Sequence, residues 1–177
     1  MSTLSVNTIT AETGNTVSLA SGKTLDASQG FTPPAGHVIQ TVSATFGTNT
    51  ATTSTSFVNT PVALSITPTS TSNKILIMVS TPIYAANAGT YAARLTIFRG
   101  TVSGVNLGNS SLGFGNFWSS TSGTSLSTVA SMSFLDSPST TSSQAYTVGM
   151  RSEGNNSSAT IMQSSANATI TLMEIQG

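Results

Sequence analysis

The run Lys74-Ile75-Leu76-Ile77-Met78-Val79-Ser80 is the longest aliphatic stretch of the chain and the starting point for its fold. It is too short to span a membrane, and its β-branched residues favour a strand. A strand that is buried on one face alternates apolar and polar residues, but this run does not alternate. Both of its faces therefore require a cover, and in a two-sheet sandwich one cover must come from outside the domain. The simplest source is another copy of the chain.

The other predicted strands fall into two kinds. The last one, Ala168–Gln176, also alternates only weakly, whereas Leu126–Leu135 and Gln144–Arg151 alternate clearly and have one solvated face. About ten short strands separated by Gly, Pro and Asn predict an all-β sandwich or barrel. The predicted strands are His37–Phe46, Ser54–Val58, Val62–Ile66, Lys74–Ser80, Tyr91–Arg99, Ser110–Phe117, Leu126–Leu135, Gln144–Arg151, Thr160–Ser164 and Ala168–Gln176.

The composition excludes several classes of partner. Only 6% of the 177 residues are charged and the net charge is zero, so we expect no nucleic-acid partner and no attraction to an anionic membrane. Because the longest aliphatic run is too short to span a membrane, we also expect no insertion into one. The chain holds no cysteine, which excludes disulfides and thiolate metal sites. Its polar residues are mostly 31 serines and 31 threonines. A neutral protein of this kind is poorly protected against association, which indicates that it works in an assembly.

Three regions follow from the distribution of apolar residues. Residues 1–30 form a polar arm too poor in apolar side chains to bury a core alone, residues 31–36 form a stiff Pro/Gly linker, and residues 37–177 form the strand-rich domain. We expect the arm to anchor the protein to a larger particle or to help it trimerise. The sparse apolar residues expected to make those contacts are Leu4, Val6, Ile9, Val17, Leu19 and Leu25.

Four segments carry a resemblance to known proteins. They are Leu4-Ser-Val-Asn-Thr-Ile-Thr with Gly14-Asn-Thr-Val-Ser-Leu-Ala-Ser-Gly-Lys-Thr-Leu25, the stretch from Ser65 to Val79, Met132-Ser-Phe-Leu-Asp-Ser-Pro138, and Ile170-Thr-Leu-Met-Glu-Ile175. In order and spacing the chain resembles structural proteins of marine and cyanobacterial bacteriophage virions, usually labelled tail fibre proteins. The resemblance implies a jelly-roll knob of the C1q and tumour-necrosis-factor type, assembled as a homotrimer on the virion surface.

The resemblance implies a non-enzymatic structural role with two alternatives. The protein is either a tail fibre or receptor-binding knob, which we prefer, or a capsid decoration protein that stabilises the head shell. Its expected partners are other virion proteins of the tail or capsid, and a host surface polysaccharide or receptor for the knob.

The two strands that are apolar on both faces supply the expected trimer interface. Its residues are Leu76, Met78, Leu172, Met173 and Glu174. A carboxylate within an apolar strand is costly unless it is paired. Glu174 therefore either pairs with Arg94 or Arg151 at the subunit contact or lies at an edge open to water.

Aromatic residues gather in the Gly/Ser/Asn-rich stretch 108–124. Phe114, Phe117 and Trp118 suit a receptor-contact loop, where exposed aromatic rings stack on sugars. The alternative is that they pack into the knob or between subunits.

No residues form a catalytic or metal-binding pattern. His37 is the only histidine, so a Ser-His-Asp triad would require it, and we interpret it as a boundary residue without chemistry. The few carboxylates form neither an acid–base pair nor a cation motif. Asp136, before Ser137-Pro138, is expected to close a turn. We expect no cofactor and no metal.

Overall fold

In the computed structural model, residues 21–22, 33–86, 91–119, 125–153 and 158–177 are described. The chain divides into two units, Met1–Thr32 and Pro33–Gly177. The second unit carries all the strands described below. The six arm residues expected to anchor the protein, Leu4, Val6, Ile9, Val17, Leu19 and Leu25, lie outside the described residues.

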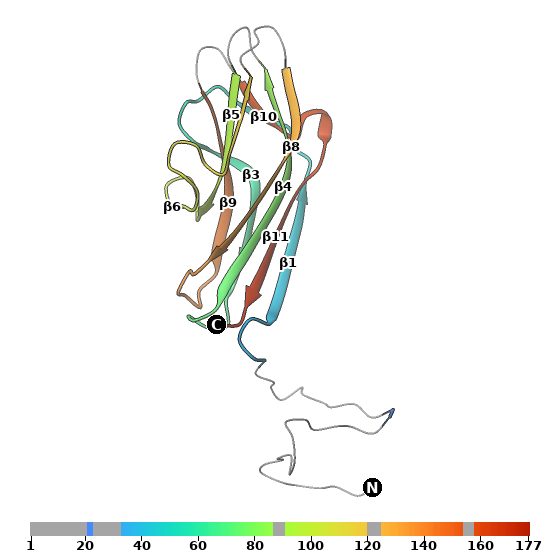
Figure 1. The fold of residues 1–177 in the computed structure, drawn as a ribbon, viewed down its shortest axis with the longest axis vertical. Helices are drawn as coiled ribbons and strands as arrows, with labels where there is room; N and C mark the ends of the chain where they lie inside the picture. Colours follow the sequence, from blue (N-terminus) through green and yellow to red (C-terminus); the bar gives the residue numbers. More distant parts are fainter. Residues whose placement is uncertain (1–20, 23–32, 87–90, 120–124, 154–157) are drawn as a thin grey trace, which may run out of the picture. The chain divides into compact units, whose positions relative to one another are not determined.

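Six antiparallel strands form the first sheet, called sheet A (Figure 1). Its centre is β4 (Lys74–Ala86), which pairs along one edge with β8 (Ser125–Asp136). The other edge of β4 pairs with β11 (Ala168–Ile175) and β10 (Ser158–Ile161). Beyond these lie β1 (Val38–Phe46), next to β11, and β2 (Thr50–Thr52), next to β10.

Five antiparallel strands form sheet B. They are β3 (Val58–Ile66), β9 (Gln144–Ser152), β5 (Tyr91–Arg99), β6 (Val105–Asn106) and β7 (Gly115–Ser119). β9 lies between β3 and β5, and β6 and β7 both pair with the far edge of β5. A short 3-10 turn, Gln163–Ser165, connects β10 to β11. The expectation of an all-β fold is confirmed.

The core lies between the inner faces of the two sheets. Alternate residues of each strand point inward, as the two-residue period of a strand requires. From sheet A come Ile75, Ile77 and Ile170, and from sheet B come Leu95 and Val148, all at 2% exposure or less. One sheet alone would leave these side chains in water, so the sandwich is the arrangement that buries both inner faces.

One predicted strand and the first half of another are wrong because polar side chains bond to the nearby backbone. In place of Ser54–Val58, the chain makes a turn in which Ser54 Oγ lies 2.8 Å from the carbonyl oxygen of Ser56 and 3.1 Å from its amide nitrogen. In place of the first half of Ser110–Phe117, the Oδ1 of Asn109 accepts bonds from the amides of Ser111 and Leu112. Such local bonds compete with strand pairing.

The connection from β5 to β7 folds back over the outer face of sheet B. It buries the outward side chains of β5, so that Arg94, Thr96 and Phe98 are only 8%, 0% and 4% exposed. The ring of Phe98 lies directly on Gly149 of β9, where an added Cβ would come within 2.6 Å of it. A loop therefore covers part of the outer face of sheet B, whereas Met78 and Leu135 are exposed on the outer face of sheet A.

Candidate interaction surfaces

The outer face of sheet A carries a cluster of apolar side chains, which we call the apolar patch. Leu76 of β4 is the register partner of Met173 on β11 and of Leu135 on β8, so the three lie in one row across the sheet. Met78 is two residues along β4 and on the same face. Met78 is 38% exposed and Leu135 48%. The patch also includes Val38, which is 53% exposed, and its register partner Ile175.

Small hydroxyl residues make up much of the remaining face, and the exposed Lys74, the register partner of Ile175, lies on it as well. Next to Met78 in the register stand Thr171 and Ser133, and Ser43 is the partner of Thr171 on β1. The hydroxyls of Ser43 and Thr171 lie 3.0 Å apart and satisfy each other. The rows of Leu76 and Met78 hold no charged residue among these register partners, so the two rows can lose their water without leaving a charge unpaired.

The structure divides the expected trimer interface between two sides of sheet A. Leu76, Met78 and Met173 belong to the apolar patch. Leu172 and Glu174 instead point between the sheets and have no exposed surface even in a single chain. These two residues cannot contact a partner through the outer face, because alternate residues of β11 point to opposite sides.

Glu174 neither pairs with an arginine nor lies at an edge open to water, so both predictions for it are wrong. Four neutral donors surround its carboxylate instead. Oε1 accepts bonds from the amide of Thr69 (2.6 Å), the hydroxyl of Thr69 (2.9 Å) and Nδ2 of Asn73 (2.6 Å), and Oε2 accepts one from Nε2 of Gln40 (2.6 Å). Burial raises the pKa of Glu174, but these hydrogen bonds outweigh it, so the pKa lies below the ordinary glutamate value. The carboxylate ties β11 to β1 and to the turn before β4.

Asp136 does not act as the predicted turn residue. It is 2% exposed at the end of β8, and its Oδ2 accepts bonds from Nε of Arg99 (2.8 Å) and from the hydroxyl of Tyr146 (2.7 Å). Nη2 of Arg99 pairs with its other oxygen. The hydrogen bond to Asp136 raises the pKa of Arg99, and burial, followed by the bond to Asp136, raises that of Tyr146. This ion pair joins sheet A to sheet B.

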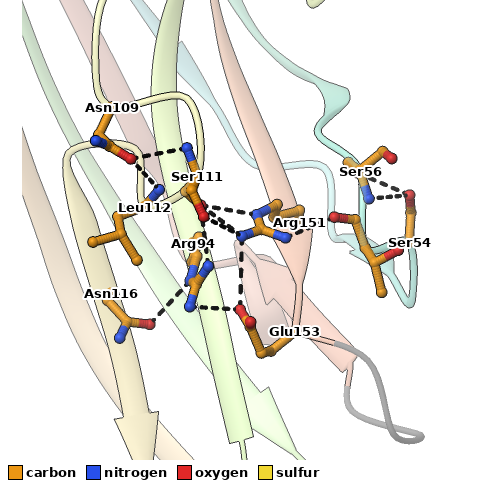
Figure 2. A network of polar contacts seen from close by, with 10 residues as sticks. Ser54, Ser56, Arg94, Asn109, Ser111, Leu112, Asn116, Arg151 and Glu153 are labelled. Carbon is orange, nitrogen blue, oxygen red and sulfur yellow. Dashed lines mark hydrogen bonds and ion pairs between the residues drawn. The ribbon is translucent and has the colours of Figure 1, made fainter.

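The other two arginines of the described residues hold the β5–β7 connection on sheet B (Figure 2). Arg94 and Arg151 are register partners on β5 and β9. Both donate to the carbonyl oxygen of Ser111, with Nη1 of Arg94 at 3.1 Å and Nε and Nη2 of Arg151 at 3.1 and 2.6 Å. Glu153 pairs with Arg94 at 2.7 Å and with Arg151 at 3.8 Å. Nη1 of Arg151 also donates to the carbonyl of Thr55 (2.7 Å) and so holds the β2–β3 turn.

An open depression of about 480 Å³ lies beside this arginine cluster. The β2–β3 turn, β5, the β5–β7 connection and β9 each contribute residues to it. The ring of Phe57 packs edge-on against Phe98 with centroids 5.8 Å apart, and the guanidinium of Arg151 lies 5.5 Å from the Phe57 centroid. The residues around the depression are Thr55, Ser56, Phe57, Phe98, Val102, Asn106, Ser110, Ser111 and Arg151.

Of the three aromatic residues expected in the receptor-contact loop, the structure describes the side chains of two. Phe114 and Phe117 are partly buried and pack against the core, and the ring of Phe114 meets Phe134 edge-on at 5.8 Å. Phe114 and Phe117 therefore agree with the alternative prediction, in which these aromatic rings pack into the knob. Trp118 pairs through its backbone with Ala92 in sheet B, and its side chain lies outside the described residues.

His37 lies exposed just before β1, where its backbone carbonyl accepts a bond from Gln176. Within the described residues, no three His, Asp or Glu side chains gather where they could hold a metal ion. In the same part of the chain, no helix has the length and apolarity needed to cross a membrane.

Sequence reasoning missed the depression on sheet B. The sequence predicts a strand around Phe57 that does not form, and it predicts Arg151 as the end of a strand or as a partner of Glu174. The one signal available was the closeness of Arg151 and Glu153 in sequence, which favours a local ion pair over a distant one. Nothing in the sequence indicates that Thr55 and Ser111 lie on either side of Arg151.

No protein-family model matches the chain, and no curated protein is significantly similar to it. The likeness to phage virion proteins therefore rests on the sequence segments alone.

Proposed function

We propose that the protein is a non-enzymatic bacteriophage virion protein, a trimeric jelly-roll knob displayed on the particle surface as a tail fibre or receptor-binding knob. The observation that carries the proposal is the apolar patch on sheet A, an uncovered apolar face in a chain with almost no charge. The phage assignment and the three-fold state come from the resemblance described above.

The order of strand pairing supports a jelly roll. The eight strands β1, β3, β4, β5, β7, β8, β9 and β11 follow one another along the chain. The first pairs with the eighth, the second with the seventh, the third with the sixth and the fourth with the fifth. This nested pairing, divided between two sheets, is the pairing of a jelly roll.

The composition of sheet A supports a second copy of the chain as the cover for the patch. Apolar patches bordered by polar residues mark interaction sites. Copies of this face can meet over the rows of Leu76 and Met78 without burying an unpaired charge, and the exposed Lys74 beside Ile175 can keep its ammonium group in water. Obligate interfaces bury about 2,000 Å² or more, so a partner would cover the hydroxyl rows as well as the patch.

The described carboxylates support a structural role. Asp136 and Glu153 pair with arginines, and Glu174 accepts four hydrogen bonds. Each therefore has a place in holding strands or loops together. His37, exposed at the start of β1, is not bonded through its ring to any of them.

Analytical ultracentrifugation of two matched variants tests the assembly. Leu135 is 48% exposed on the apolar patch, and Val105 is 53% exposed on sheet B. Because both side chains reach water in the single chain, aspartate at either position leaves the fold intact. We expect the wild type and Val105→Asp to sediment as trimers and Leu135→Asp to dissociate. A monomeric wild type at micromolar concentration, or a trimeric Leu135→Asp, would contradict the assignment of this face.

The position on the particle needs a second measurement. Purified virions that carry the protein are analysed by quantitative gel staining for its copy number. A few to tens of copies indicate a tail part, hundreds indicate the capsid decoration alternative, and absence from the particle refutes the virion role.

A further inference from the structure

We infer that the depression on the outer face of sheet B is a binding site for a neutral saccharide. The inference deepens the proposed function, since it gives the displayed knob a class of ligand. It also assigns that contact to Phe57 and its neighbours and not to Phe114 and Phe117, which pack against the core.

The position of the depression leaves it free in the proposed assembly. The apolar patch faces outward from sheet A, whereas the depression lies over β5 and β9 of sheet B, on the other side of the core. Copies that associate through sheet A therefore present the depression to their surroundings.

Two sets of hydrogen bonds hold the walls of the depression in place. Arg151 joins the β2–β3 turn to the β5–β7 connection through the carbonyls of Thr55 and Ser111. The Ser54 hydroxyl fixes the same turn at Ser56, next to Phe57. A site whose walls are already ordered loses little conformational entropy when a ligand binds.

The lining matches the two-sided chemistry of a sugar ring. Phe57 and Val102 offer apolar surface for the C–H face of a pyranose, and Phe57 is only partly buried. The hydroxyls of Thr55, Ser56 and Ser110 line the same depression and bond to no other described residue, so they are available to sugar hydroxyls. Its volume of about 480 Å³ lies within the ordinary range of small-ligand sites, roughly 300–1,000 Å³.

The state of Arg151 favours a neutral ligand over an anionic one. Its Nε, Nη1 and Nη2 already donate to protein carbonyls, and Glu153 lies 3.8 Å from Nη2. The guanidinium thus serves as a clamp and has few donors left for a carboxylate or sulfate. No carboxylate is among the described residues that line the depression, so it holds no negative charge to attract a cation.

Saturation-transfer difference NMR on the full chain tests the inference. The probes are neutral di- and trisaccharides of glucose, galactose, mannose and N-acetylglucosamine, together with acidic ones that contain uronic or sialic acid. We expect at least one neutral probe to bind with a Kd of about 1 mM, as suits an open site, and the acidic probes to bind no better.

Four variants locate the binding on the depression. Phe57→Leu keeps the apolar contact with Phe98 but removes the aromatic face, and should weaken binding about tenfold. Phe57→Tyr keeps the face and should bind like the wild type. Ser110→Ala should weaken binding, whereas Ser133→Ala, the matched exposed serine on sheet A, should leave it unchanged.

The inference is overturned if no neutral probe binds at about 10 mM, if only acidic probes bind, or if Phe57→Leu binds like the wild type. Ultracentrifugation of the same samples keeps this outcome separate from the proposed function. A trimer that binds no saccharide refutes the site alone, and a monomer that binds one refutes the assembly alone.

Discussion

Replacing Glu174 should reveal how much of the domain's stability depends on one buried carboxylate. Glu174→Leu removes the acceptor for four hydrogen bonds, of which the one from Asn73 Nδ2 is buried and those from Thr69 and Gln40 are partly buried. Glu174→Gln keeps one oxygen in place. It can retain the three bonds that Oε1 accepts, but it sets an NH₂ group against the amide of Gln40.

The number of donors left without a partner sets the expected magnitudes. An unsatisfied buried donor, here Asn73 Nδ2, costs about 1–3 kcal/mol, and the three partly buried donors add a smaller cost because water can reach them. Burying a leucine side chain returns part of this, so we expect Glu174→Leu to lower the free energy of unfolding by about 2–4 kcal/mol. Glu174→Gln loses one bond and the charge on the others, which together amount to about 1–2 kcal/mol.

The pH dependence follows from the lowered pKa of Glu174. Its ordinary value of 4.5 applies to the unfolded chain, and the folded value is lower. The carboxylate therefore contributes its full stabilisation above pH 4.5 and loses it as the pH falls from there through the folded pKa. Glutamine does not titrate, so the difference between wild type and Glu174→Gln should shrink across this window.

Urea unfolding followed by tryptophan fluorescence, at one protein concentration and at pH 7 and pH 3, measures all three proteins. The other carboxylates titrate in wild type and variant alike and cancel in the difference. If the free energies of unfolding of wild type and Glu174→Gln differ by the same amount at pH 7 and pH 3, the hydrogen bonds to Glu174 do not stabilise its charged form. If Glu174→Leu is as stable as the wild type, the hydrogen bonds around Glu174 carry no net stability.

Three further predictions follow from other contacts. Asp136→Asn should cost about 2–3 kcal/mol in urea unfolding, below the 3–5 kcal/mol of a fully buried pair, because the Arg99 side chain is 28% exposed and Tyr146 keeps an acceptor; an unchanged midpoint would contradict this. Gly113→Ala should lower the melting temperature by several degrees, since φ is +66° and the new Cβ would lie 2.1 Å from a carbonyl oxygen of β5; a calorimetric scan like that of the wild type would disprove the strain. Deleting residues 1–30 should give a soluble trimer by light scattering that no longer joins virions, and incorporation at normal copy number would place the anchor in the knob.

The all-β fold and most strand positions were predictable because strand periodicity is local. Tyr91–Arg99 is a strand at the predicted bounds, and Lys74–Ser80 is the first half of β4. The failures came where a serine or asparagine side chain bonds the backbone a few residues away, as at Ser54 and Asn109. Such a bond is also local, but Ser and Thr are frequent in both the strands and the turns of this chain. Their presence in a stretch therefore does not distinguish a turn from a strand.

The sequence by itself determined that Leu76, Met78 and Met173 lie on faces opposite to their apolar neighbours, because successive residues of a strand point to opposite sides. Only the tertiary structure decided which face looks inward. It placed Leu172 and Glu174 in the interior and gave Glu174 the donors of Asn73, Thr69 and Gln40. It likewise brought Phe57, Ser110 and Arg151 to one depression. These residues are far apart along the chain, and their proximity depends on how two sheets pair and pack, which no local pattern encodes.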